Sequence, residues 1–155
     1  MHVLIKWLHL LALIVWVGEV VFFSFVVAPA MFDTFPVVEA GRAVGAVLPL
    51  YYRLGYVCGA VLVLTSVLLR RGAAARAWWS VNAGLAAVML VATLYAGVVL
   101  LPRASALRPQ IHEPTAPPAA KEEFDRLHRL AVQLNGAVLL GGIAVSFITA
   151  AALRP

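Results

Sequence analysis

The amino-acid sequence predicts an all-α, polytopic membrane protein, a bundle of four transmembrane helices in a single domain over residues 1–155. Of the 155 residues, 63% are hydrophobic and 12% are charged, and the mean hydropathy is +0.95. An average soluble domain carries about 25% charged and about 45–50% apolar residues. Four apolar stretches also reach the roughly 20 residues that cross a bilayer. We therefore expect a lipid bilayer around the chain.

The first predicted span covers about residues 3–30 and is closed by Pro29. Its apolar run, Leu8–Val27, exceeds the roughly 7–15 residues of a signal-peptide core, so we expect a membrane span rather than a cleaved leader. Glu19 interrupts this run. A charge at the bilayer centre costs at least about 2.5–3.5 kcal/mol, and such residues usually face a partner or a wet cavity. Glu19 is therefore a candidate functional residue; the alternative is a neutral acid that bonds a neighbouring helix.

The second predicted span covers about residues 50–69 and is closed by Arg70 and Arg71. The stretch before it has valines and a leucine on one side of a helical pattern, with Glu39 and Arg42 on the other. That pattern is typical of a helix lying at the membrane interface. We expect a short amphipathic interfacial helix between spans one and two.

The third predicted span covers about residues 77–101, and the fourth covers about residues 124–153. Tryptophans open the third span, as the interface favours, and Pro102 closes it. Residues 104–121 connect the two spans. Because four prolines lie between Arg108 and Lys121, we expect a Pro-rich loop with no regular helix through most of it.

Charge indicates where the chain resides. The net charge of +5 comes from basic residues that flank the spans, and no basic stripe interleaved with aromatics predicts nucleic-acid binding. Four spans put both termini on one side of the membrane. Although the opposite side has more basic residues in total, three arginines crowd the tight turn 70–76. We expect cytoplasmic termini and a bacterial inner or plasma membrane location.

Depth along the helices predicts an intramembrane polar cluster. Asn135 lies seven residues after His128, about 10 Å along span four. Glu19 lies past the middle of span one, towards the same side of the membrane, and Tyr95 and Arg103 approach from the end of span three. We predict a cluster of Glu19, Tyr95, Asn135 and His128 with Arg103 at its mouth. Other polar residues in the spans, Asn82, Thr149 and Ser66 among them, are interpreted as helix-packing positions.

Two histidines, His9 and His128, suggest an alternative function, the binding of haem or a metal ion. His9 begins span one and His128 begins span four, and these spans start on opposite sides of the membrane. At 1.5 Å per residue the two imidazoles are tens of ångströms apart, so they cannot bind one iron within a monomer. A haem or metal ion held by His9 would need a ligand from elsewhere in the chain or from another protomer. Cys58 stands alone, which excludes an intrachain disulfide.

Four segments match a known family: "HLLALIVWVG" (9–18), "LPLYYRLGYVCG" (48–59), "LLPRAS" (100–105) and "FDRLHRLAVQLNG" (124–136). Through them the chain resembles the transmembrane protein 205-like family, small membrane proteins of poorly defined activity. The most specific is the spacing of Phe124, His128 and Asn135, although Ala131 stands where the family commonly has a serine. The opening of span one is also similar to CopD-type copper-resistance proteins and HemJ-type oxidases. The resemblance implies a four-helix membrane protein associated with drug and metal tolerance.

Three functions are compatible with these features. The first is a membrane protein that binds or passes a small solute, proton or metal at the predicted cluster. The second is a haem-binding or redox protein of CopD or HemJ type. The third is a structural subunit or assembly factor, as a homo-oligomer or within a larger complex. Hydrolase and kinase signatures are missing from the sequence, which favours a non-enzymatic role.

Overall fold

The computed structural model describes residues 2–71, 76–111 and 117–153, and in this part of the chain the regular structure is helical throughout. Four helical rods, His2–Thr34, Val37–Leu69, Arg76–Ile111 and Pro118–Ala152, are long and apolar enough to cross a membrane. The predicted fold class is therefore confirmed. In chain order the elements are α1 (His2–Phe22), the π-helical segment η1 (Phe23–Val27), α2 (Ala28–Thr34), α3 (Val37–Leu69), α4 (Arg76–Tyr95), the π-helical segment η2 (Ala96–Leu100), α5 (Leu101–Ile111) and α6 (Pro118–Ala152).

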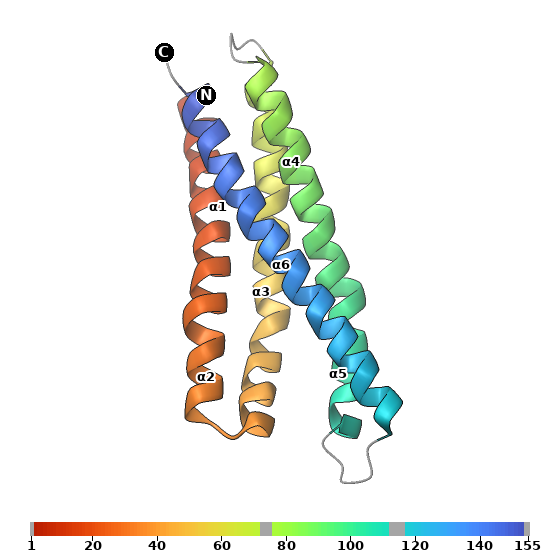
Figure 1. Ribbon diagram of the computed structural model, residues 1–155. Helices are drawn as coiled ribbons and strands as arrows, with labels where there is room; N and C mark the ends of the chain where they lie inside the picture. The colour runs from red at the N-terminus through yellow and green to blue at the C-terminus, as the bar shows by residue number, and fades with distance from the viewer. Residues whose placement is uncertain (1, 72–75, 112–116, 154–155) are drawn as a thin grey trace.

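The four rods form one bundle with two distinct ends (Figure 1). The start of α1, the end of α3, the start of α4 and the end of α6 lie together; we call this the terminal end. The other end, where α2 meets α3 and α5 lies beside the start of α6, is the loop end. α6 crosses the bundle diagonally, from α1 at the terminal end to α5 at the loop end (Figure 1). Each polar residue in a span can therefore be placed by its distance from the terminal end.

Two π-helical segments correct the predicted ends of spans one and three. η1 ends two residues before Pro29, and η2 ends two residues before Pro102. A proline in an α-helix lacks the N–H donor and pushes against the carbonyl one turn earlier. A π-turn widens the backbone there, so the helix continues. The first rod therefore reaches Thr34 and the third reaches Ile111, well past the prolines that the sequence suggested would close them.

Two further expectations about the connections are wrong. The predicted separate interfacial helix is the first part of α3, which begins after Pro36 and continues through Pro49 without a break. The predicted Pro-rich loop is largely helical, because α5 extends to Ile111 and α6 begins at Pro118, where a proline suits the first helical position. Residues 112–116 of that loop lie outside the described part of the chain.

The buried positions of α1 recur in α4. One shift of register carries the buried residues His9, Leu13, Trp16 and Val20 onto Asn82, Ala86, Met89 and Thr93, which are also buried. The same shift carries η1 and its proline onto η2 and its proline. The first and third rods are therefore equivalent in their buried face and in the place where they widen, although their sequences show no obvious repeat.

The second and fourth rods are related in the same way. One shift of register carries six of the ten buried positions of α3 onto buried positions of α6. Positions 55, 58, 59, 62, 66 and 69 of α3 correspond to 138, 141, 142, 145, 149 and 152 of α6. In this register Gly59 corresponds to Gly142, and Ser66 corresponds to Thr149. The chain thus forms two helical hairpins, α1 to α3 and α4 to α6, whose buried faces partly correspond; we call them the two halves.

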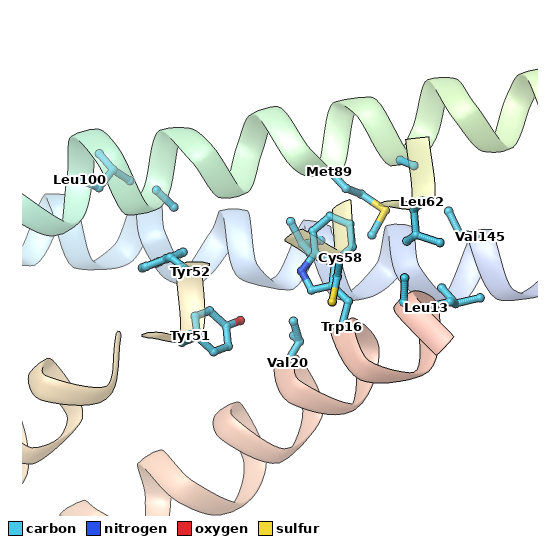
Figure 2. Packing of buried hydrophobic residues seen from close by; sticks show 14 of the residues in the cluster. Leu13, Trp16, Val20, Tyr51, Tyr52, Cys58, Leu62, Met89, Leu100 and Val145 are labelled. Carbon is cyan, nitrogen blue, oxygen red and sulfur yellow. The ribbon is translucent and has the colours of Figure 1, made fainter. Parts of the chain in front are cut away.

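Trp16 fills the middle of the bundle (Figure 2). It is 2% exposed, and it lies against two glycines one turn apart on α3. A Cβ at Gly55 would lie 3.1 Å from the indole Nε1, and one at Gly59 would lie 2.9 Å from the far edge of the ring. Because only glycine leaves room there, α1 and α3 can enclose the indole completely. The surrounding cluster includes Cys58 and Met89, so the single thiol is packed in the core.

Candidate functional site

A polar centre lies inside the terminal end of the bundle, and each of the four rods contributes to it. His9 from α1 is 1% exposed. Its Nδ1 lies 2.9 Å from the hydroxyl of Thr65 on α3, and its Nε2 lies 3.0 Å from the hydroxyl of Thr149 on α6. Asn82 from α4 donates its amide to Thr149 at 2.9 Å, and Trp79 packs edge-on against the imidazole. We call His9, Thr65, Ser66, Asn82 and Thr149 the terminal-end centre.

Hydrogen-bond direction fixes the tautomer of His9. The Thr65 hydroxyl donates its single proton to the backbone carbonyl of Val61 at 2.7 Å. It can therefore only accept from His9, which places a proton on Nδ1. Nε2 is then free to accept from the Thr149 hydroxyl, whose own lone pair accepts from Asn82. A neutral imidazole satisfies every bond of this network, and no acidic residue takes part in it.

Two oxygen atoms of the terminal-end centre have no partner within the described chain. They are Oδ1 of Asn82 and Oγ of Ser66, and both residues are fully buried at 0% exposure. Asn82 and Ser66 are the register counterparts of His9 and Thr149, which do bond each other. The pair His9 and Thr149 is therefore satisfied, whereas the equivalent pair Asn82 and Ser66 keeps two unpartnered oxygens. Buried polar groups without partners are costly, so this second pair has capacity for an additional hydrogen-bonding group.

A second polar group, the loop-end cluster, joins α1, η1, α3 and α6. The Tyr51 hydroxyl on α3 donates to Oδ1 of Asn135 on α6. The Asn135 amide in turn donates to the Ser24 hydroxyl in η1 at 2.9 Å. Phe23 of η1 packs on the Tyr51 ring, with centroids 4.9 Å apart. The widened π-turn thus supplies two of the groups that surround Tyr51.

Glu19 belongs to the loop-end cluster. Its side chain is half-buried, and one carboxyl oxygen, Oε2, is fully buried without a hydrogen-bond partner in the described chain. The carboxyl lies within electrostatic reach of the Tyr51 hydroxyl and the Cys58 thiol, both on α3. It therefore faces the bundle and not only the acyl chains. Ten residues, or about 15 Å of helix, separate it from His9.

A small cavity borders the loop-end cluster. Its volume is about 10 Å³, and Trp16, Tyr51, Thr93 and Asn135 are among its lining residues. A space of this size is close to the smallest that holds one water molecule, and several polar atoms are within reach of it. The indole of Trp16, which lies between His9 and Glu19 in depth along α1, forms one wall of the cavity. The two polar groups are therefore separated by an apolar layer.

The structure assembles only part of the cluster predicted from the sequence. Glu19 and Asn135 are turned into the bundle, but Tyr95 is 44% exposed, and Arg103 and His128 are also exposed. His128 stacks on Phe124 one turn earlier on the surface of α6. These residues were grouped because they lie at similar depths along their helices. The rotation of each helix about its axis, however, turns Tyr95, Arg103 and His128 outward.

We expect that replacing His128 with alanine leaves the fold and the loop-end cluster unchanged. Its imidazole contacts Phe124 on an exposed face, and such surface changes usually alter stability by less than about 0.5 kcal/mol. Thermal unfolding of the purified variant in detergent would measure this. A large loss of stability would show that the exposed ring has a role that its contacts do not reveal.

The residues around His9 do not fit a haem or metal centre. Both ring nitrogens are used in hydrogen bonds to threonine hydroxyls, so neither is free to bind iron or another metal. In the described residues no three His, Cys, Asp or Glu side chains come together. Neutral hydroxyl and amide oxygens surround the imidazole instead, a set better suited to neutral hydrogen-bonding groups than to the soft or redox metals that histidine usually binds.

Several residues of both groups were overlooked as site residues by sequence reasoning. Thr65 and Ser24 carry only a hydroxyl, and Tyr51 resembles an ordinary interfacial aromatic. Asn82 and Thr149 were interpreted as packing positions. One signal could have found the terminal-end centre: His9, Thr65, Asn82 and Thr149 all lie within a few turns of the terminal end of their rods.

Comparison with known proteins places the chain in a family. A family described as a domain of unknown function (DUF4149) matches residues 11–113. The match includes Glu19, Tyr51 and Asn82, and it leaves out His9 and the fourth rod. Curated proteins and solved structures give no match to the chain. Since the matched region covers more than half of its residues, this four-helix membrane protein belongs to the DUF4149 family.

Proposed function

We propose that this protein binds a proton or a small polar solute at Glu19 in the loop-end cluster and passes it across the membrane. The observation that carries the proposal is the buried carboxyl oxygen without a partner. A carboxylate in a membrane interior is tolerated when a partner or a wet cavity offsets its desolvation. No such partner is present among the described residues, so the group is suited to take one up.

The surroundings of Glu19 support exchange as well as binding. Tyr51, Asn135 and Ser24 form a hydrogen-bonded chain beside the carboxyl, and hydroxyl and amide groups can both donate and accept. A water-sized cavity adjoins this chain. Trp16 lies between Glu19 and the terminal-end centre in depth along α1 and is buried, so the proposed passage requires movement of the indole or of the π-turn that follows it.

Carbodiimide labelling tests the binding step. A hydrophobic carbodiimide adds to a protonated carboxyl group in the membrane and leaves a stable adduct that peptide mass spectrometry can locate. We expect the adduct on Glu19, its complete loss in Glu19→Gln, and no change in Glu39→Gln. Glu39 is a suitable control because it is exposed at the start of α3. Labelling that persists in Glu19→Gln would contradict the proposal.

Flux through reconstituted vesicles tests the passage step. Protein in liposomes with an internal pH indicator should dissipate an imposed pH gradient faster than empty vesicles. If the proton is the substrate, Glu19→Gln should reduce the rate to that of empty vesicles, while Glu39→Gln should retain it. If both variants dissipate the gradient at the same rate, Glu19 does not carry the proton.

Several earlier expectations stay predictions. Cytoplasmic termini, a bacterial inner-membrane location and assembly into an oligomer or larger complex are compatible with the apolar rods and await direct tests. The similarity to transmembrane protein 205-like, CopD-type and HemJ-type proteins also stays a prediction. The loop-end cluster requires none of these relationships.

A further inference from the structure

A groove opens to the bilayer between α1 and α6 at the terminal end. Its volume is about 400 Å³, within the range of pockets that bind small molecules. The walls are regular: one face of α1 and one face of α6 line it at helical spacing. The lining residues are Leu10, Leu13, Ile14, Val17 and Gly18 from α1, and Ser146, Thr149, Ala150 and Leu153 from α6.

The equivalent seam on the other side of the bundle, between α3 and α4, differs. The register that relates the first and third rods carries Leu10, Leu13 and Ile14 onto three alanines of α4, which lies against α3. Small residues let helices approach closely, whereas large ones hold them apart. At these three positions α4 can approach α3 closely, and the contact between α3 and α4 is indeed the more extensive one, whereas a groove remains between α1 and α6. The counterpart alanines are Ala83, Ala86 and Ala87.

Thr149 connects this groove to the terminal-end centre. It lines the groove, and its hydroxyl also bonds both His9 and Asn82 inside the bundle. The amide nitrogen of Asn82 lies 2.9 Å from the Thr149 hydroxyl. The carbonyl oxygen of the same side chain accepts no hydrogen bond. An unpartnered oxygen, Oδ1 of Asn82, thus lies behind Thr149 in the wall of a mostly apolar groove.

We propose that the α1–α6 groove binds a lipid-soluble amphiphile with a hydroxyl head, which enters sideways from the bilayer. The apolar tail lies along Ile14, Val17 and Gly18. Asn82 does not itself line the groove, so the Thr149 side chain turns aside to let the hydroxyl donate to the unpartnered oxygen of Asn82. A plain acyl chain would fill the groove but would leave that acceptor unsatisfied, so the head group provides the selectivity. This site is separate from Glu19 and does not depend on the function proposed for it.

Photolabelling with a matched pair of probes tests the site. One probe is a long-chain alkyl diazirine with a terminal hydroxyl, and the other is the same alkyl diazirine without it. After irradiation of the protein in liposomes, we expect the hydroxyl probe to label residues 10–18 and 146–153 about tenfold more than the plain probe does, since tenfold corresponds to roughly one hydrogen bond. Equal labelling by both probes would overturn the proposal and indicate an ordinary lipid-facing surface.

A substitution that fills the groove, compared with one outside it, tests whether the probe binds there. Gly18→Leu fills the groove, and a Cβ there meets no atom within 4 Å, so the fold should tolerate it. Gly84→Leu is the matched control, because its Cβ also meets open space but lies on α4, outside the groove. Gly18→Leu should reduce labelling by the hydroxyl probe about tenfold, and Gly84→Leu should not. Unchanged labelling in Gly18→Leu would show that the probe binds elsewhere.

Thr149→Val tests the hydroxyl contact with little change in shape. It should lower labelling by the hydroxyl probe to the level of the plain probe. Labelling by the plain probe should not change. If both probes lose labelling equally, the effect is one of packing, and the proposed recognition of the head group is wrong.

Discussion

Replacing Trp16 with alanine is expected to lower the free energy of unfolding by about 3–5 kcal/mol, the usual cost of removing a buried aromatic side chain. The indole is almost fully enclosed, and it packs against the glycines of α3. Alanine would leave a cavity that the rigid rods cannot close, because Gly55 and Gly59 have no side chains to fill it. Unfolding of the variant and the wild type in mixed detergent micelles would measure the difference.

Trp78→Ala provides the matched control. The same atoms are removed, but Trp78 is 45% exposed at the start of α4 and contributes little to the core. We expect its unfolding free energy to change by less than about 1 kcal/mol, as for surface substitutions. If the two variants lost equal stability, the packing of Trp16 against the α3 glycines would not be the source of its effect.

Replacing His9 with alanine is expected to cost about 2–3 kcal/mol of stability. The imidazole is fully buried and joins α1 to α3 and α6 through its two threonine contacts. Hydrogen bonds between helices in membranes average about 0.6 kcal/mol each, so the two bonds account for roughly half of the loss. The cavity left by the ring accounts for the remainder.

A double substitution separates these two contributions. Thr65→Val together with Thr149→Val removes both partners of His9 and nearly preserves the volume of the core. We expect this variant to lose about 1–2 kcal/mol, less than His9→Ala, with the same unfolding measurement. A loss as large as that of His9→Ala would mean that the polar network, and not the packing of the ring, dominates the stability of the terminal end.

The two halves of the bundle explain why similar rods can have different roles. Trp16 and Met89 occupy counterpart positions, as do His9 and Asn82. In each pair both side chains are buried, but they differ in size or in hydrogen-bonding capacity. Between the halves, Ser66 of α3 and Asn82 of α4 therefore each retain an unpartnered oxygen, and a groove remains beside Leu10 and Ile14.

Composition and hydropathy were enough to predict the class of the protein and the number of its membrane rods. Four stretches of about 20 apolar residues permit few other arrangements in a bilayer, where every backbone polar group must be satisfied within a helix. The same physical argument identified Glu19 as the residue that needs a sheltering environment. Those predictions depend on one rod at a time, so they needed no knowledge of neighbours.

The positions of prolines were a weaker guide. Pro29 and Pro102 suggested helix ends, but each follows a π-turn that accommodates the ring and lets the rod continue. Pro109 lies inside α5, and Pro118 opens α6. Whether a proline ends a helix depends on the local hydrogen-bond pattern, which residue type alone does not specify.

Only the tertiary structure decided which polar residues meet. Depth can be counted along a sequence, but rotation about each helix axis depends on packing with the other rods. Rotation places Tyr95 and His128 outside the bundle, and it brings His9 together with Thr65, Asn82 and Thr149. The sequence by itself determined a four-helix membrane protein with an acid that needs shelter; the side chains that surround each site were determined by how the four rods turn towards one another.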